Sequence, residues 1–425
     1  MNQQLNILLI GQGGRESALA WKILGSPRIG TLYTAPGYYP GAIQATGLAL
    51  DDFEAVAEFV ERHAIDITLV GPTEYMMSGL VDYLLEQDMT VIGPPSGTAV
   101  LETSKEQAKD FMTENIIPTP RCMSVTQDTV AEGLAFMDSR RPPYVLKADG
   151  LSRGCGVWLI DNLADAKDML ADMLDGRFGE ASETVLIEDF VEGRECSVFA
   201  ALDGENYLML TPAQDYKRLF NGNRGPNTAG MGAYSPVGWA DPAFLEKVER
   251  RIVIPTVNAL RERGELYRGF LYLGIKNDGG EPVLLEYNVR LGDPEAQVIL
   301  PRMESDILDL LEAMAEGTLG DYKTVWSPQT CVGVVVAGAG YPSGPMQTEA
   351  VDGLEEAEAT GCLVFPDDLT KDATGRIVTS GGRVVTLVGV GGNLATAAAT
   401  AFEGAERIRL DNKHFRTDIG TPESD

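Results

Sequence analysis

The segment EYNVRLGDPEAQ, residues 286–297, carries side chains whose types and spacing could do chemistry. It follows the apolar run PVLL at residues 282–285, which predicts a buried strand. Glu286 and Asn288 are two residues apart on that strand, so their side chains leave the same face. Oxygen donors on one rigid strand suit Mg²⁺, which takes few protein ligands and shares the phosphates of a substrate. Arg290 continues this face and can hold a carboxylate or a phosphate through two parallel hydrogen bonds; the alternative is an ordinary polar strand end.

The composition is that of a soluble globular enzyme. The chain has 425 residues, of which 44% are hydrophobic and 23% are charged, and this length suggests roughly two to four domains. The net charge of -29 argues against nonspecific nucleic-acid binding and against adhesion to anionic membranes. No apolar run approaches the roughly 20 residues that span a bilayer, and the N-terminus lacks the basic start of a signal peptide. The five cysteines are scattered, which fits a reduced cytoplasm and no zinc site, so we expect a cytoplasmic protein.

The first part of the chain, residues 1–103, is predicted to be an α/β domain with a doubly wound parallel sheet. Short apolar strands end at glycine or proline turns, with helical patterns between them, at residues 5–10, 31–34, 66–70 and 91–92. Ligands of such sheets bind beyond the carboxyl ends of the strands, so the loops that follow these strands should face one crevice. The glycine loop GQGGRE does not fit a nicotinamide or flavin site, because Glu16 takes the place of the third glycine and the second strand lacks a ribose-binding acid.

Three further parts are predicted along the rest of the chain, with bounds at 104–190, 191–325 and 326–425. The first two contain a charged helix, strands around a glycine loop and a strand hairpin that includes the segment described above. The stretch 214–236 is long, polar and glycine-rich, which favours a functional or disordered loop. The last part alternates strands with an alanine-rich helix and predicts a small C-terminal α/β module.

A second group of residues fits phosphates and a nucleotide. Lys147 stands at the end of an apolar strand, where a charge is costly unless an anion meets it. The next loop, SRGCG at 152–156, can wrap phosphates with its backbone N–H groups, although it is not a Walker loop and a plain glycine hairpin is the alternative. Residues 188–191 follow a strand and can offer backbone edges and an apolar wall to a base. Glu195 can accept hydrogen bonds from ribose hydroxyls, or can be a solvated charge.

Together these pieces resemble one enzyme family over nearly the whole chain. The motifs that carry the resemblance are GGRE, VGP, IGPPSGTAVLETSKEQAKDFM, VLKADGL, IEDFVEGREC, QDYKR, GPNTAGMGAYSP, GFLYLGI, EYNVRLGDPEAQ, RMESD, TSGGRVV and FRTDIG. The pair GPNTAGMGAYSP and EYNVRLGDPE is highly specific. The chain resembles the ATP-grasp enzymes and, within them, the phosphoribosylamine–glycine ligase (glycinamide ribonucleotide synthetase) family. The resemblance implies an α/β protein with an ATP-grasp fold between the N-terminal parallel-sheet domain and the small C-terminal module.

The resemblance also implies a role for individual residues. ATP would be bound by Lys105, Lys147, Gly154, Gly156, Glu188, Asp189, Val191 and Glu195, with the phosphates on the lysines and the lid loop 152–156, adenine on residues 188–191 and the ribose on Glu195. The catalytic residues would be Asp215, Lys217 and Arg290, and we expect Arg153 to join them in place of the family's lid lysine. Mg²⁺, or Mn²⁺, would be bound by Glu286 and Asn288. Glycine and its acyl phosphate would be surrounded by Asp215, Lys217, Asn227, Thr228, Gly230, Met231, Arg290 and Asp293. The amine substrate would be held by Gly13, Gly14 and Arg15.

The implied reaction is an ATP-dependent ligation of glycine to 5-phosphoribosylamine in de novo purine synthesis. The carboxylate would attack the γ-phosphate of ATP, and the amine would then displace phosphate from the acyl phosphate to give glycinamide ribonucleotide. Positioning of the substrates and neutralisation of their charges would account for most of the rate enhancement. The expected partners are therefore small molecules, an amino acid and an amine, with no nucleic acid and no membrane.

The chain departs from the family pattern at five places. The family's usual residues are replaced by Ser17 after GGRE, by Tyr38 and Tyr39 in APGYYPG, by Thr73 in VGPTEYM, by Cys155 in the lid loop and by PDDL at 366–369. Four of these changes fall where the amine is expected, so a paralogous ligase with another amine, and with another acid as a further option, stays open. The lost lid lysine leaves open an inactive nucleotide-binding protein. We expect Arg153 to compensate, because a flexible loop lets a long guanidinium reach the phosphates.

Overall fold

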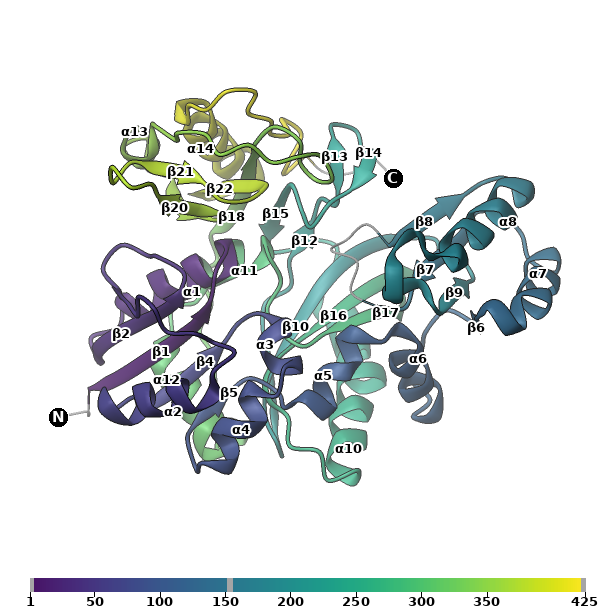
Figure 1. Cartoon of the computed structure of the whole chain (residues 1–425), viewed down its shortest axis with the longest axis horizontal. Coiled ribbons are helices and arrows are strands. Elements are labelled where there is room, and N and C mark those ends of the chain that lie inside the picture. The colour runs from purple at the N-terminus through teal and green to yellow at the C-terminus, as the bar shows by residue number, and fades with distance from the viewer. Residues whose placement is uncertain (1–3, 151–155, 422–425) are drawn as a thin grey trace.

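The computed structural model describes residues 4–150 and 156–421, and its N-terminal part is a doubly wound parallel sheet (Figure 1). The strands lie in the order β3-β2-β1-β4-β5, and every pairing between them is parallel. The predicted sheet is therefore confirmed. Its elements are β1 Leu5–Gly11, α1 Gly14–Leu24, β2 Ile29–Pro36, β3 Ile43–Gln44, α2 Phe53–Arg62, β4 Ile67–Val70, α3 Thr73–Met77, α4 Leu80–Glu86, β5 Val91–Ile92 and α5 Ser96–Thr103.

The middle of the chain forms two separate antiparallel sheets. The smaller sheet, β6-β9-β7-β8, has its own apolar core and lies at the right of Figure 1, drawn in blue and teal. The larger sheet, β11-β10-β16-β17, runs through the centre of the molecule. The smaller unit contains β6 Cys122–Val125, α7 Val130–Asp138, β7 Tyr144–Ala148, β8 Val157–Ile160, α8 Leu163–Asp172 and β9 Val185–Glu188. The preceding helix, α6 Lys105–Glu114, packs its apolar side chains into the main core.

The central sheet is built from long strands with strong apolar patterns. Strand β16 (Arg268–Asp278) is buried over most of its length, and β17 (Glu281–Asn288) pairs with it antiparallel, as the hairpin pattern predicted. Strand β17 ends at Asn288, so Arg290 lies just past the strand and not on it. The other elements are β10 Arg194–Asp203, β11 Tyr207–Met209, α9 Pro242–Val248, α10 Ile254–Glu262, α11 Glu295–Ile299 and α12 Ile307–Glu316.

The stretch 214–236, predicted as a loop, is instead built from short strands. These strands are β12 Gln214–Asp215, β13 Arg218–Phe220, β14 Arg224–Asn227 and β15 Gly232–Ser235. Strands β13 and β14 form a hairpin, while β15 pairs with β12 and with a strand about 100 residues further along the chain. Strand β15 depends on hydrogen bonds to a partner far along the chain, and strands this short show little hydrophobic pattern of their own.

The C-terminal module shares its sheet with the central part of the chain. Its order is β12-β15-β18-β22-β19, so two strands from residues 214–235 continue the sheet of the last hundred residues. Figure 1 shows the yellow-green module above the purple N-terminal domain. Strand β19 of this module contacts α1. The elements are β18 Thr330–Ala337, α13 Leu354–Glu358, β19 Leu363–Pro366, β20 Leu369–Lys371, β21 Ile377–Thr379, β22 Arg383–Gly391 and α14 Leu394–Arg407. Within residues 4–150 and 156–421, no helix has the length and apolar character to span a membrane.

Candidate active site

The polar end of β17 faces a group of cations. Glu286 lies opposite Gly274 of β16, and its Oε1 is 3.8 Å from Nζ of Lys217. Burial pushes the pKa of Glu286 upward, but the charges of Lys217, Lys147, Lys105 and Arg290 outweigh burial and leave it below its usual value. Asn288 lies two residues on and accepts a hydrogen bond from Nη2 of Arg290 at 3.4 Å. The predicted metal residues thus lie together as an ionised carboxylate and an amide oxygen.

A buried carboxylate holds two lysines at the junction of the two antiparallel sheets. Glu188, at the end of β9, lies 2.8 Å from Nζ of Lys147 and 3.2 Å from Nζ of Lys109, and all three side chains are at most 7% exposed. Burial raises the pKa of Glu188, but the two ammonium groups overcome it and lower the pKa. The Glu188 carboxylate is therefore already paired with the two lysines. A nucleotide base bound here would contact the backbone of residues 188–191 and not this carboxylate. Lys109 was not predicted as a site residue, although it lies one helical turn after Lys105.

Lys105 lies at the entrance to the loop that was predicted to cover the phosphates. Its ammonium donates to the carbonyls of Asp149 and Gly150, at 3.1 and 3.2 Å. Burial lowers the pKa of Lys105, and the charge of Lys147 acts in the same direction. Arg153, Gly154 and Cys155 fall outside the described residues, so their roles stay predictions. Gly156 is described, and its carbonyl accepts the N–H of Ala148 at 2.9 Å.

One cluster joins residues that were predicted to bind different substrates. It contains Asp215 and Lys217, predicted to surround glycine, and Glu195, predicted to bind the ribose. Nζ of Lys217 is 2.5 Å from Oε1 of Glu195. Burial opposes the charge of Lys217, but Glu195 and Asp215 raise its pKa well above the usual value. Burial is also the main cause that raises the pKa of Asp215 to about 7; Lys217 opposes this shift, while Glu295, Glu195 and Glu286 add to it. A carboxylate with this pKa can exchange a proton near neutral pH.

The acceptor loop 227–231 is fixed by hydrogen bonds to neighbouring segments. The Thr228 hydroxyl donates to the carbonyl of Lys217 at 2.9 Å, and the N–H of Gly230 donates to that hydroxyl at 3.0 Å. Gly230 has φ 132°, and a Cβ at this position would lie 2.4 Å from Cδ of Pro294, so the close approach requires glycine. Met231 is fully buried, and the Asn227 amide donates to the carbonyl of Val157, at the start of β8, at 3.4 Å. The loop is therefore a rigid wall of the site.

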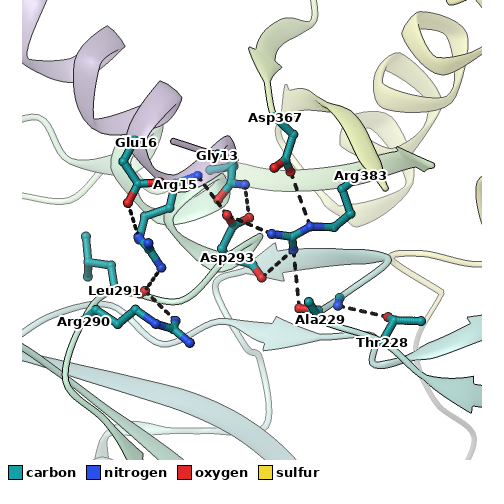
Figure 2. A network of polar contacts seen from close by, with 12 residues as sticks. Gly13, Arg15, Glu16, Thr228, Ala229, Arg290, Leu291, Asp293, Asp367 and Arg383 are labelled. Carbon is teal, nitrogen blue, oxygen red and sulfur yellow. Dashed lines mark hydrogen bonds and ion pairs between the residues drawn. The ribbon is translucent and has the colours of Figure 1, made fainter. Parts of the chain in front are cut away.

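The N–H groups of Gly13, Gly14 and Arg15, at the start of α1, all have protein partners; Figure 2 shows Arg15 beside Asp293. Gly13 donates to the hydroxyl of Tyr39 at 3.2 Å, Gly14 to the carboxylate of Asp367, and Arg15 to Oδ2 of Asp293 at 3.2 Å. Tyr39 is 3% exposed and thus closes on the glycine loop, whereas Tyr38 is exposed and has Lys371 over its ring. Two of the departures from the family pattern, Tyr39 and the PDDL segment, therefore meet at the predicted amine-binding residues.

Arg383, from β22, ties this region to the C-terminal module. Its Nη2 is 2.9 Å from Asp293, its Nε is 3.5 Å from Asp367, and its Nη1 donates to the Asp293 carbonyl at 2.8 Å (Figure 2). Burial raises the pKa of Asp293, but Arg383 and Arg15 outweigh burial and lower it. The pKa of Asp367 is raised well above the usual value, because burial exceeds the effect of Arg383. The motif TSGGRVV contained this arginine, but its spacing gave no sign of its partners.

Two of the remaining predicted nucleotide residues, Asp189 and Val191, follow the end of β9 in the smaller sheet. The Asp189 carboxylate is 3.5 Å from Nε of Arg140, and Val191 is half-buried. Within the described part of the chain, no group of three or more His, Cys, Asp or Glu side chains is arranged to hold a metal ion by itself. Glu286 and Asn288 fit a hard divalent ion only as part of a coordination shell that a nucleotide completes.

Comparisons with known proteins cover almost the whole chain. Residues 5–102, 103–296 and 331–422 match the N domain, the ATP-grasp (A) domain and the C domain of phosphoribosylglycinamide synthetase. The phosphoribosylamine–glycine ligase of Pseudomonas aeruginosa is 40% identical over 423 residues, which cover 98% of this chain and 97% of that protein. The enzyme of the same name from Neisseria meningitidis serogroup B is 39% identical over 419 residues, 98% of each chain.

Solved structures give the same result. The crystal structure of phosphoribosylamine–glycine ligase from Thermotoga maritima is 31% identical, covers 97% of this chain and 100% of its own, and has a TM-score of 0.82. The biotin carboxylase of Campylobacter jejuni, with 14% identity and a TM-score of 0.69, shares the fold.

Proposed function

The chain belongs to the phosphoribosylglycinamide synthetase family, and on that premise we propose that it joins the carboxylate of glycine to the amine of 5-phosphoribosylamine. As a member of this family it is an ATP-dependent ligase, so the inactive-protein alternative is set aside. The products are glycinamide ribonucleotide, ADP and phosphate, and the reaction is a step of de novo purine synthesis. The reaction proceeds in two steps through an acyl phosphate.

In this proposal, the residues at the sheet junction bind the nucleotide. Lys105 and Lys147 contact its phosphates, the backbone of residues 188–191 contacts adenine, and Glu195 contacts the ribose. Glu188 keeps Lys147 charged and in place, since it is 2.8 Å from the ammonium in a buried site. Glu286 and Asn288 hold Mg²⁺, which supplies charge neutralisation on the phosphates when bound; Mn²⁺ fits the same oxygen donors.

The central cluster handles the carboxylate and the amine. Arg290 and Lys217 orient the glycine carboxylate, whose oxygen attacks the γ-phosphorus while the bond to ADP breaks. The rigid loop with Asn227, Thr228, Gly230 and Met231 then holds the acyl phosphate against water. The amine nitrogen attacks the acyl carbon, phosphate leaves, and Asp215 takes the proton that the nitrogen loses, as its pKa of about 7 permits.

The observation that carries the proposal is the meeting of β17 with three lysines at one site. Glu286 stays ionised there because Lys217, Lys147 and Lys105 surround it, an arrangement that suits a metal–phosphate complex. The test uses glycine labelled with ¹⁸O in its carboxylate, together with ATP and 5-phosphoribosylamine made in the assay. We expect glycinamide ribonucleotide, with one labelled oxygen in each released phosphate. Label that stays wholly in the amide and water would exclude the acyl phosphate.

A ligase with a different amine remains the second candidate, and the N-terminus of α1 supports it. The N–H groups of Gly13, Gly14 and Arg15 are already bonded within the protein, so a substrate phosphate would need other partners or would have to displace Tyr39 and Asp367. If the crevice is remodelled, the unmodified chain should turn over 5-phosphoribosylamine poorly while it still binds ATP. Tyr39→Ala should then raise kcat/KM for this amine. Efficient turnover by the unmodified chain eliminates this candidate.

The remaining features of the proposal concern the chain as a whole. We propose four domains with bounds at 1–103, 104–190, 191–325 and 326–425; the last bound divides the five-stranded sheet, with β12 and β15 on one side and β18, β22 and β19 on the other. The net charge of -29 supports small-molecule partners with no nucleic-acid or membrane partner, and the scattered cysteines support a cytoplasmic location.

A further inference from the structure

A buried glutamate outside the predicted site residues connects the N-terminal domain to the end of the metal-binding strand. Glu102 lies near the end of α5, and its side chain is 6% exposed. Its Oε2 accepts the N–H of Val289 at 2.8 Å, and its Oε1 is 3.1 Å from Nη2 of Arg290. One carboxylate therefore fixes both the backbone between Asn288 and Arg290 and the guanidinium of Arg290.

The third partner of the Glu102 carboxylate is one of the residues that differ from the family pattern. The hydroxyl of Thr73, at the start of α3, donates to Oε2 of Glu102 at 2.9 Å, and Thr73 is 3% exposed. Thr73 is thus not a wall of the amine crevice, where its position in VGPTEYM had placed it. Its hydroxyl orients Glu102 from within the N-terminal domain.

Arg290 is held from both sides by these contacts. The same Nη2 that meets Glu102 also donates to Oδ1 of Asn288 at 3.4 Å, and Nη1 donates to the carbonyl of Leu291 at 3.1 Å. A guanidinium that binds a carboxylate through two parallel hydrogen bonds must present its fork at a fixed angle. An ion pair with a buried and doubly anchored carboxylate sets that angle, whereas backbone carbonyls alone leave the side chain free to rotate.

We propose that Glu102 is a positioning residue for the ligase reaction, and that it acts through Arg290. Through this contact the N-terminal domain, which holds the amine, sets the fork that receives the glycine carboxylate and its acyl phosphate. The inference rests on the proposed function in the roles given to Arg290 and to the N-terminal domain. A misplaced positioning group costs about 10- to 100-fold in rate when the reacting atoms are close to attack geometry.

The central experiment is a double-mutant cycle of Glu102→Gln and Arg290→Gln, read as steady-state ADP formation. Glutamine keeps an oxygen for the Val289 N–H but cannot pair with the guanidinium. We expect Glu102→Gln to lower kcat about 10-fold or more and to raise KM for glycine, with KM for ATP nearly unchanged. If Glu102 acts through Arg290, the double variant is no slower than Arg290→Gln alone. Rate losses that multiply, or normal kinetics in Glu102→Gln, would overturn the proposal.

Two further variants separate positioning from stability. Asp82→Asn weakens the other end of the same helix, where Asp82 accepts the N–H and the hydroxyl of Ser96 at 2.9 and 3.0 Å. It should lower the unfolding midpoint and leave kcat and KM for glycine unchanged; parallel kinetic losses in this control would assign Glu102 a merely structural role. Glu102→Asp keeps the charge, and it should recover part of kcat and serves as the charged variant if the glutamine form folds poorly.

Failure of the proposed function is visible separately, as a lack of ADP formation by the unmodified chain with glycine and 5-phosphoribosylamine. In that event the cycle is read with the acid and amine that the chain does turn over from a panel. Non-additive losses there would still support the coupling of Glu102 and Arg290, and multiplying losses would still refute it.

Discussion

Replacement of Glu188 by glutamine should uncover how much the smaller antiparallel domain depends on its buried ion cluster. The change keeps the shape of the side chain and removes the charge that Lys147 and Lys109 share. At an effective dielectric constant of about 20, the attraction is about 6 kcal/mol across the 2.8 Å contact and about 5 kcal/mol across the 3.2 Å contact. Most of this attraction offsets the desolvation of three nearly buried charges. Removal of one partner therefore should cost a net amount of about 3–5 kcal/mol.

The assay is hydrogen–deuterium exchange of peptides that cover β7 and β9, because a chain of several domains need not unfold in one step. We expect Glu188→Gln to speed exchange in these two strands. The matched control is Glu281→Gln, which also removes a carboxylate between two cations, Lys247 and Arg251, but does so at the surface. Exchange in β17 should stay nearly unchanged in this control, since exposed ion pairs contribute little. Equal effects of the two substitutions would refute the argument from burial.

The dependence on pH follows from the direction of the shift. The pKa of Glu188 is lowered in the folded chain, so its stabilisation is present above the ordinary value of 4.5 and is lost as the pH falls through the lower folded value. The difference between the unmodified chain and Glu188→Gln should therefore shrink on acidification. MgATP should protect the variant more than the unmodified chain, because the phosphates then supply the missing negative charge near Lys147. Equal protection by MgATP would indicate that the phosphates do not reach this lysine.

Three further predictions test other parts of the site. Glu286→Ala should abolish ADP formation with an unchanged circular dichroism spectrum, whereas Glu281→Ala on the same strand should keep turnover; normal turnover of the first variant would remove Glu286 from the metal site. In the unmodified chain the rate should fall below about pH 7 as Asp215 is protonated, and Asp215→Asn should lose this fall; an unchanged pH profile of the rate would contradict its role as proton acceptor. The variant should also be more stable than the unmodified chain at pH 8 but not at pH 4. The pKa of Asp215 is raised in the folded chain, so the stabilisation that its protonated form contributes is lost as the pH rises through about 7. Arg383→Gln leaves Asp293 and Asp367 buried without their shared cation, so it should cost about 3–5 kcal/mol and speed exchange in β19 and β22; exchange confined to the surface loops would contradict this.

The sequence alone was sufficient for the parts of the fold that follow from local patterns. Apolar runs that end at glycine or proline predicted the parallel sheet of the first hundred residues, and the structure confirmed it. The hairpin of β16 and β17 followed from two strongly apolar segments and a DGG turn. Glu286 and Asn288 could be placed on one face because a strand repeats every two residues. The family was recognised from highly specific motifs, because local hydrophobic patterns predict strands and helices but do not identify a family.

Only the tertiary structure decided which charges meet. The strand β15, between residues 232 and 235, could not be predicted, because its partner β18 lies about 100 residues away. The same holds for Glu102 with Arg290, Lys109 with Glu188, and Arg383 with Asp367, each of which joins separate elements. Sequence spacing constrains neighbours within one helix or strand, whereas a buried ion pair between elements depends on how their faces pack. The sequence thus predicted metal-binding residues on β17, and the folded chain determined which side chains surround them.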